Sequence, residues 1–97
     1  MATVVYEDFE WDSDKAASNV SKHGVSFEEA STVFGDLDYL LVPDTAERDR
    51  FLAVGFSALA RILVVVHIER GERLRIISAR RATRTETETY ERRRSPG

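Results

Sequence analysis

The first third of the chain has a segment of strand-forming residues that alternates poorly, followed by apolar residues at helical spacing. A run of β-branched and aromatic residues over 4–11 predicts a short strand. Asp12 then offers an N-cap, and a narrow apolar stripe predicts a helix over 13–23. The motif Ser26-Phe-Glu-Glu29 is a capping box, in which both side chains satisfy backbone donors, and it predicts a second helix that ends at Gly35. The two helices should form a bent pair over one face of a sheet.

Four apolar segments in the rest of the chain predict strands. They lie at 39–42, 51–57, 61–68 and 73–79. Since 61–68 is apolar on both alternating faces, it should be a central strand with cover on both sides. Glu69-Arg-Gly-Glu72 turns it back into the last strand, which makes the segment an antiparallel meander. A second capping box, Thr83-Arg-Thr-Glu86, predicts a helix from about 83 to 94.

This order of elements predicts an α+β fold. We expect a twisted antiparallel sheet covered by two N-terminal helices and one C-terminal helix. A length of 97 residues fits a single domain over 1–97. Within it, the N-terminal strand and helix pair would occupy about 4–35, the meander about 39–79 and the last helix about 83–94.

Charge is distributed unevenly along the chain. Residues 61–97 hold ten arginines against five acids, whereas residues 1–60 hold four bases against twelve acids. A basic region on an acidic protein attracts phosphates, and arginine binds phosphate in a planar, bidentate fashion. Arginine accounts for twelve of the fourteen basic residues, and it suits nucleic acid better than lysine does. A solvated helix and strand edge without a ligand is the open alternative.

Composition also restricts where the protein works. The chain has no cysteine, so it uses neither disulfides nor thiolate metal ligands. Its longest near-continuous apolar run, 62–68, is far shorter than the roughly 20 residues of a membrane helix. The N-terminus lacks a signal-peptide pattern. We expect a cytoplasmic protein that does not contact a membrane.

Several motifs stand in a fixed order over about 9–91. They are Phe9-Glu-Trp-Asp12, Lys15, Asn19, Lys22-His-Gly-Val25, Phe27-Glu-Glu-Ala30, Arg50-Phe-Leu-Ala-Val-Gly55, Arg75-Ile-Ile-Ser-Ala-Arg80 and the spacing from Glu86 to Tyr90. Together they resemble the BrnT family, small toxins of type II toxin–antitoxin systems. The resemblance implies a RelE-like fold and a ribonuclease that halts translation. It also implies a BrnA-like antitoxin that binds DNA, so that DNA would be met only through that partner.

Metal-independent RNA cleavage needs a base for the 2′-hydroxyl, an acid for the leaving 5′-oxygen and cations for the phosphate. Histidine, with an ordinary pKa of about 6.5, can serve as either acid or base. The chain has two: His23 follows Lys22 at the end of the first predicted helix, and His67 interrupts the apolar central strand. A structural role is open for both, because His23 could bind the last helix carbonyls and His67 could be a core imidazole. Which histidine would be the acid also stays open.

Arginines around the junction of the last strand and the last helix are the best phosphate site. Arg80 and Arg81 precede a capping box whose free N–H groups also favour an anion. Arg50 enters the third predicted strand of the chain, over 51–57, and is a second candidate, with an ion pair to Asp49 or Glu47 as the alternative. Tyr90 could stack on a base or donate a proton, or could pack on the sheet.

Strand parity leaves the spatial relation of these residues open. It places His67 on one face with Leu63 and Val65, and Arg80 on one face with Leu74, Ile76 and Ser78. We predict a catalytic site made of His67, Arg80 and Arg50, with contributions from Lys22, His23 and Tyr90. The predicted RNA-binding residues are Arg75, Arg80, Arg81 and Arg84.

Other sites are not favoured by the sequence. Trp11 precedes a helix cap and should pack in the core, and the capping role of Glu29 argues against a two-carboxylate site with Glu28. No zinc-like ligand spacing occurs, so we expect neither a metal nor a cofactor. Two non-catalytic functions remain as alternatives. The arginine-rich face could bind RNA or an acidic protein without cleaving anything, or the last helix with Arg92-Arg-Arg94 could only dock a partner.

Overall fold

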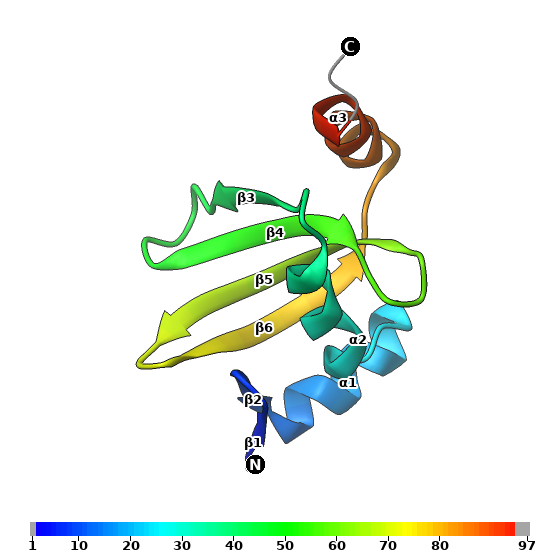
Figure 1. The fold of residues 1–97 in the computed structure, drawn as a ribbon. Helices are drawn as coiled ribbons and strands as arrows, with labels where there is room; N and C mark the ends of the chain where they lie inside the picture. Colours follow the sequence, from blue (N-terminus) through cyan, green and yellow to red (C-terminus); the bar gives the residue numbers. More distant parts are fainter. Residues whose placement is uncertain (1, 95–97) are drawn as a thin grey trace.

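The computed structural model describes residues 2–94; residues 1 and 95–97, which the predicted single domain includes, lie outside the described residues. The strands are β1 (Thr3–Tyr6), β2 (Phe9–Asp12), β3 (Leu40–Pro43), β4 (Arg50–Phe56), β5 (Ile62–Arg70) and β6 (Arg73–Arg81). The helices are α1 (Ser13–His23), α2 (Phe27–Ser31), the 3₁₀-helix η1 (Thr32–Gly35) and α3 (Arg84–Arg94). Figure 1 shows them in one ribbon.

The strands form one six-stranded sheet in the order β1-β2-β6-β5-β4-β3. The predicted α+β fold with a β3-to-β6 meander is confirmed. The sheet is mixed, however, because β2 lies parallel to β6 through Phe9 and Glu10. Helices and the whole meander separate these two strands in the chain, so no tight turn forces them to be antiparallel.

The single strand predicted over 4–11 is a hairpin that turns at Glu7, whose φ is +55°.

The larger part of the core lies on the sheet face under α2 and η1, which we call the α2 face (Figure 1). Its buried residues are Trp11, Val25, Phe27, Ala30, Val33, Ala53, Leu63, Val65, Ile76 and Ala79. Trp11 packs edge-on against Phe27 with ring centroids 5.8 Å apart, which confirms its predicted core position.

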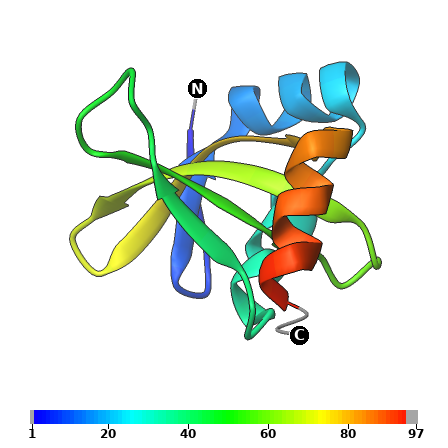
Figure 2. The same ribbon diagram turned by 90° about the horizontal axis from the view of Figure 1, so that it is seen from above.

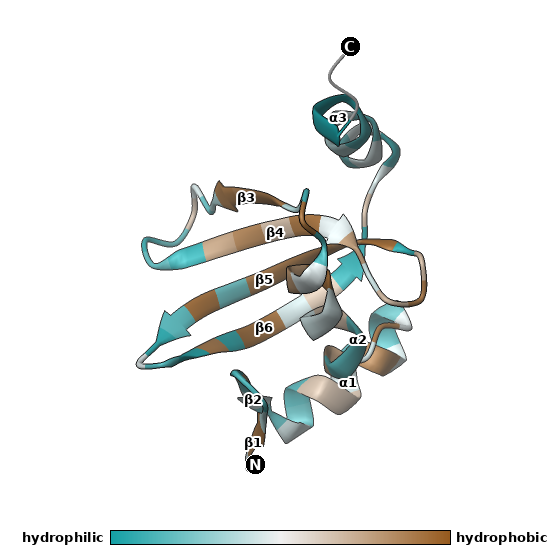
Figure 3. Cartoon of the chain, in the orientation of Figure 1, coloured by the Kyte–Doolittle hydropathy of each residue, from teal (hydrophilic) through white to brown (hydrophobic). Residues whose placement is uncertain are grey.

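The opposite face of the sheet is covered at one end by α3. Tyr90 is the buried residue of this helix and packs with Val54 and Val64. Figures 1 and 2 show α3 crossing the sheet at the end away from the β5–β6 hairpin. The helix is largely hydrophilic along its length (Figure 3), so little apolar surface attaches it to the sheet.

A β-bulge in β6 decides which side chains share a face. Val66 lies opposite Ser78, but the next residue of β5, His67, lies opposite Ile76, so Ile77 is the extra residue. Residues directly opposite each other on antiparallel strands share a face. Ile76 therefore points into the α2 face, whereas Ser78 and Arg80 belong to the other. The predicted shared face of Ile76 and Arg80 is wrong, because a bulge breaks simple alternation.

The predicted helix caps are present with one difference. The Asp12 carboxylate accepts from the Lys15 N–H at 3.0 Å, and the Ser26 hydroxyl accepts from the Glu29 N–H at 3.0 Å. The Glu29 carboxylate does not complete its capping box. It lies buried and accepts hydrogen bonds from Arg61 Nε at 2.9 Å and Ser57 Oγ at 2.6 Å, which attach α2 to the β4–β5 loop.

Candidate functional site

Three of the predicted arginines lie on the sheet face opposite α2. Arg50 lies opposite Ile68 and Ile68 lies opposite Arg75, so the three side chains form one row across β4, β5 and β6. Arg80 lies opposite Val64, on the same face and nearer α3. We call this surface, with Arg50, Arg75 and Arg80, the arginine face.

Arg50 is half-buried at the start of β4. Its Nε atom is buried and, among residues 2–94, has no hydrogen-bond partner. The predicted alternative, an ion pair with Asp49 or Glu47, does not occur in the described part of the chain. Because Nε is closed to solvent, an anion that approaches the sheet would meet the terminal Nη groups of this guanidinium.

Arg75 and Arg80, in contrast, each hold a carboxylate. Arg75 Nη1 donates to Glu10 Oε2 at 2.7 Å, across the β2–β6 pair. Arg80 forms a two-pronged pair with Glu86, with both N···O distances at 2.8 Å. The hydrogen bond from Arg80 lowers the pKa of Glu86 to about 2, against a raising effect of burial. Arg80 thus joins β6 to the first turn of α3.

Glu86 also completes the predicted capping box at the start of α3. Its Oε1 accepts from the Thr83 N–H at 2.8 Å, and the Thr83 hydroxyl accepts from the Glu86 N–H at 3.2 Å. The anion that the sequence places at this helix start is therefore a carboxylate of the chain itself. The structure brings Arg80 to the predicted strand-to-helix junction, but both of its terminal nitrogens already donate to the Glu86 carboxylate.

The other two predicted RNA-binding arginines lie apart from the arginine face. Arg81 is exposed and lies opposite Leu63, on the α2 side of the sheet. Arg84 is exposed on α3 and lies 3.5 Å from Glu88, one turn along the helix. Neither side chain joins the row formed by Arg50 and Arg75.

A cavity of about 190 Å³ lies between α1 and the edge of β6. Its lining is mostly polar and basic: Lys15, Ser18, Asn19, Lys22, His23, Ile77 and Ser78. Lys15, Lys22 and His23 are all exposed. Since Ser78 belongs to the same sheet face as Arg80, this cavity borders the arginine face. The structure therefore brings Lys22 and His23 together with a lysine and a serine that the sequence did not single out as a site.

Asn19 fixes α1 against β6 and so shapes this cavity. Beyond the short β2 pairing, the edge of β6 has no neighbouring strand among residues 2–94. The buried Asn19 side chain takes that place, donating to the Ala79 carbonyl at 2.8 Å and accepting from the Ala79 N–H at 3.1 Å. It also donates to the Val25 carbonyl at 2.9 Å, after the end of α1. The role of Asn19, left open by the sequence, is to complete a sheet edge.

His67 does not join the predicted site. It points into the α2 face, is only 3% exposed, and stacks on Phe51 with centroids 6.0 Å apart while Phe34 meets it edge-on at 5.0 Å. Neither ring nitrogen has a hydrogen-bond partner among the described residues. Burial lowers the pKa of His67 to about 4, so the ring is neutral near pH 7. The structure does not bring His67 together with Arg50 and Arg80, because the sheet separates it from them.

Tyr90 is a buried anchor for α3. Its hydroxyl donates to the Asp36 carboxylate, and its ring meets Phe56 edge-on at 5.7 Å. Burial, together with the Asp36 hydrogen bond, raises the pKa of Tyr90 to about 12. This placement agrees with the packing alternative and keeps the hydroxyl from reaching RNA.

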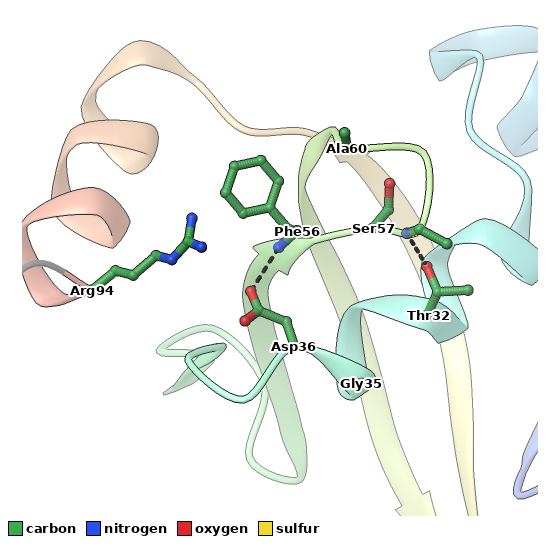
Figure 4. Close-up of a pocket in the computed structure, with 8 residues that line it drawn as sticks. Thr32, Gly35, Asp36, Phe56, Ser57, Ala60 and Arg94 are labelled. Carbon is green, nitrogen blue, oxygen red and sulfur yellow. Dashed lines mark hydrogen bonds between the residues drawn. The ribbon is translucent and has the colours of Figure 1, made fainter.

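Asp36 also lines a separate open cavity of about 500 Å³ beside the C-terminal end of α3 (Figure 4). The Asp36 carboxylate accepts from the Phe56 N–H at 2.9 Å, and the Thr32 hydroxyl accepts from the Ala58 N–H at 2.8 Å. Arg94 reaches over the Phe56 ring at 5.1 Å. The polar groups of this cavity are thus mainly engaged in holding α3 and the β4–β5 loop.

One signal in the sequence could have found the α1 cavity. Lys15, Ser18, Asn19 and Lys22 recur at helical spacing and so lie on one face of α1. A buried amide flanked by two lysines marks the side on which the helix meets the sheet.

Among residues 2–94, no three His, Cys, Asp or Glu side chains are grouped as a metal site. No helix in the same part of the chain is long and apolar enough to span a membrane.

Comparison with known proteins agrees with this architecture. The family model described as "Ribonuclease toxin, BrnT, of type II toxin-antitoxin system" matches residues 11–86. The crystal structure of the Brucella abortus ribonuclease toxin BrnT superposes with a TM-score of 0.62 at 30% sequence identity, covering 76% of this chain and 94% of that one. No curated protein matches the chain. The chain belongs to the BrnT family, the ribonuclease toxins of type II toxin–antitoxin systems.

Proposed function

We propose that this chain is a cytoplasmic endoribonuclease that cleaves RNA without a metal ion and thereby inhibits translation. The observation that carries the proposal is the cavity between α1 and β6. It groups the exposed imidazole of His23 with the ammonium groups of Lys15 and Lys22, next to the arginine face. These are the group types that metal-independent phosphodiester cleavage requires.

In the proposed reaction, His23 takes the proton of a ribose 2′-hydroxyl. The 2′-oxygen attacks phosphorus, the bond to the 5′-oxygen breaks, and a lysine ammonium of the cavity protonates the leaving oxygen. The products are a 2′,3′-cyclic phosphate and a 5′-hydroxyl end. Lys22 and Lys15 also stabilise the negative charge that develops on the phosphate. His67 has no part in this reaction, because it lies buried on the far side of the sheet.

RNA would continue from the cavity across the arginine face. Arg50 would bind a backbone phosphate most directly, since no ion pair between described residues engages its guanidinium. Arg75 and Arg80 are already paired with carboxylates and would contribute mainly to the local positive potential. Arg81 and Arg84 remain candidates for RNA that extends beyond this face.

We further propose that a BrnA-like antitoxin neutralises the protein. Membership of a type II toxin–antitoxin family supports a protein inhibitor as the partner. DNA would then be contacted only through that antitoxin.

A time course on naked total RNA with EDTA present tests the activity. The purified chain, free of antitoxin, should cleave, and His23→Gln should slow cleavage roughly 100- to 10,000-fold, the usual contribution of general acid–base catalysis. Lys22→Ala should also reduce the rate, whereas His67→Leu should leave it unchanged. Full activity of His23→Gln would exclude the proposed base.

The same experiment separates the second candidate, a module that binds RNA without cleaving it. The carboxylate pairs of Arg75 and Arg80 favour this alternative, because they leave fewer cations free for a transition state. Such a module would bind RNA in a salt-dependent manner, and Arg50→Ala would weaken it, but no variant would change a cleavage rate. Inhibition of a cell-free translation mixture without cleavage of naked RNA would point instead to ribosome-dependent cleavage.

A further inference from the structure

An apolar groove of about 240 Å³ lies on the arginine face, between α3 and the strands β3 and β4. Its floor and wall are Leu40, Val42, Leu52, Val54, Thr85, Glu86 and Thr89. Arg50, Leu52 and Val54 alternate along β4, so the floor of the groove belongs to the same sheet face as the Arg50 side chain. The two β3 residues lie directly opposite the two β4 residues and extend this floor to the edge of the sheet.

The wall of the groove adds polar groups to the apolar floor. Thr85 and Thr89 are exposed and lie one turn apart on α3. The acid of this wall, Glu86, is held by Arg80 through two hydrogen bonds of 2.8 Å, so its negative charge is already paired. A concave apolar surface with a few polar groups at its rim suits a flat apolar ligand that has a hydrogen-bonding edge.

Arg50 places a cation beside this groove. It stands two residues from Leu52 on the same face of β4, about 7 Å away along the strand. None of the ion pairs between described residues includes it. The neighbouring Asp44 carboxylate accepts from the Ala46 N–H at 2.8 Å, within its own loop. These charges favour a ligand that carries a phosphate next to its apolar ring, as a nucleotide does.

The register of the sheet links the groove to the α1 cavity. Leu52 lies opposite Val66, and Val66 lies opposite Ser78. Leu52 lines the groove and Ser78 lines the α1 cavity, so one row of three side chains joins the two sites. Because neighbouring strands are about 5 Å apart, these two lining residues are about 10 Å apart across the sheet. One short stretch of RNA would therefore occupy both sites.

We propose that the groove is a nucleobase-binding site for single-stranded RNA, close to the phosphate that is cleaved. The base would lie on Leu52 and Val54, while its polar edge meets the threonine hydroxyls of α3. The phosphate of that nucleotide or the next would meet Arg50. The inference rests on the proposed ribonuclease function and adds the place where the protein contacts a base. Such a contact would give cleavage a base preference near the broken bond.

Binding of short RNA oligonucleotides tests the base site separately from cleavage. Every 2′-hydroxyl of these oligonucleotides is methylated, so that the 2′-oxygen cannot attack the phosphate. Adenine, cytosine and uracil homopolymers are compared with an abasic chain of equal length by fluorescence anisotropy. The unmodified protein should bind at least one homopolymer roughly 5- to 100-fold more tightly than the abasic chain, the range typical of one stacked base in a single-strand binding site.

Two variants alter the groove in different ways, and thermal unfolding checks that each is folded. Thr89→Leu fills the groove with aliphatic carbon, and Val42→Ser removes apolar surface at a position that is 40% exposed. In both, the preference for the homopolymer should fall at least roughly fivefold, while the affinity for the abasic chain stays unchanged. Thr87→Leu is the matched control, because Thr87 does not line the groove, and it should bind as the unmodified protein does. Arg50→Ala should weaken binding of both kinds of chain equally, since it removes a phosphate contact.

Each other result has a distinct meaning. An unchanged preference in both groove variants overturns the base site and leaves the groove for an apolar side chain of a protein partner. Equal weakening toward the homopolymer and the abasic chain also overturns it, because that loss does not involve the base. If the unmodified protein binds no oligonucleotide, the proposed RNA function fails and the base site fails with it. Base-dependent binding without cleavage of ordinary RNA would reject the proposed reaction and support the base site.

Discussion

Protonation of His67 should destabilise the folded protein in mild acid. The ring is enclosed by Phe34 and Phe51, with both nitrogens buried and without hydrogen-bond partners in residues 2–94. Burial lowers its pKa from 6.5 to about 4. Above pH 6.5 the ring is neutral in both the folded and the unfolded state, and it then costs no stability through proton binding. As the pH falls from 6.5 to 4 the unfolded state takes up the proton first, and the free energy of unfolding should decrease by roughly 3 kcal/mol.

Urea unfolding of the unmodified chain and of His67→Leu at pH 7.5 and pH 4.5 measures this effect. Leucine has a similar volume and no polar atoms, so the variant should be equal in stability at pH 7.5 or more stable by about 1 kcal/mol. Its advantage should widen by roughly 2 to 3 kcal/mol at pH 4.5, because only the unmodified chain contains the histidine that resists protonation. Other titrating groups affect both proteins and cancel in the comparison.

The measurement also decides between a core role and a catalytic role for His67. If the stability difference is the same at both pH values, His67 is not the buried neutral ring described above. If His67→Leu folds normally but loses RNA cleavage, the catalytic role first suggested by the sequence is restored. Retained cleavage together with reduced acid sensitivity would support a purely structural histidine.

Three further substitutions test the contacts around the site. Asn19→Ala removes three hydrogen bonds of 2.8 to 3.1 Å and leaves the Ala79 backbone groups without these side-chain partners. The free energy of unfolding, measured in urea, should therefore fall by about 2–4 kcal/mol. Ser18→Ala is the matched control on the same helix, and equal stability of the two variants would exclude the edge-completing role of Asn19. Tyr90→Phe keeps the ring but removes the donor to Asp36, so the free energy of unfolding, measured by thermal unfolding, should fall by about 1–2 kcal/mol while RNA cleavage is unchanged. A cleavage defect at normal stability would instead make the hydroxyl catalytic. Arg50→Ala should weaken RNA binding in filter assays more than Arg80→Ala does, since Arg80 is engaged with Glu86, and the reverse order would contradict the proposed path of RNA.

The parts of the fold that sequence predicted well depend on local signals. Asp12, Ser26 and Thr83 each accept a hydrogen bond from the backbone N–H three residues ahead, as the cap patterns require. The meander follows from apolar strands joined by short turns. Such features involve residues a few positions apart, and their geometry follows from the chain alone.

The candidate site was harder to predict because it depends on contacts between distant residues. The bulge at Ile77 reverses the parity of β6, and without it Arg80 would point to the same face as Ile76. Asn19 reaches across 60 positions to Ala79. Glu29 pairs with Arg61 from another element instead of completing its own helix cap. A pattern of neighbouring residues in the sequence does not show that Asn19 will meet Ala79 or that Glu29 will meet Arg61.

The uneven charge of the sequence acquires a meaning once the chain is folded. Acids of the first 60 residues pair with arginines of the last third: Glu10 with Arg75, Glu29 with Arg61 and Asp38 with Arg94. These pairs neutralise much of the difference between the two halves and hold the hairpin, α2 and α3 to the sheet. Arg50 forms no ion pair between described residues, and the exposed side chains of Lys15 and Lys22 line the neighbouring α1 cavity. Pairing of the acids therefore leaves positive charge on the arginine face and beside it, where it suits a polyanion.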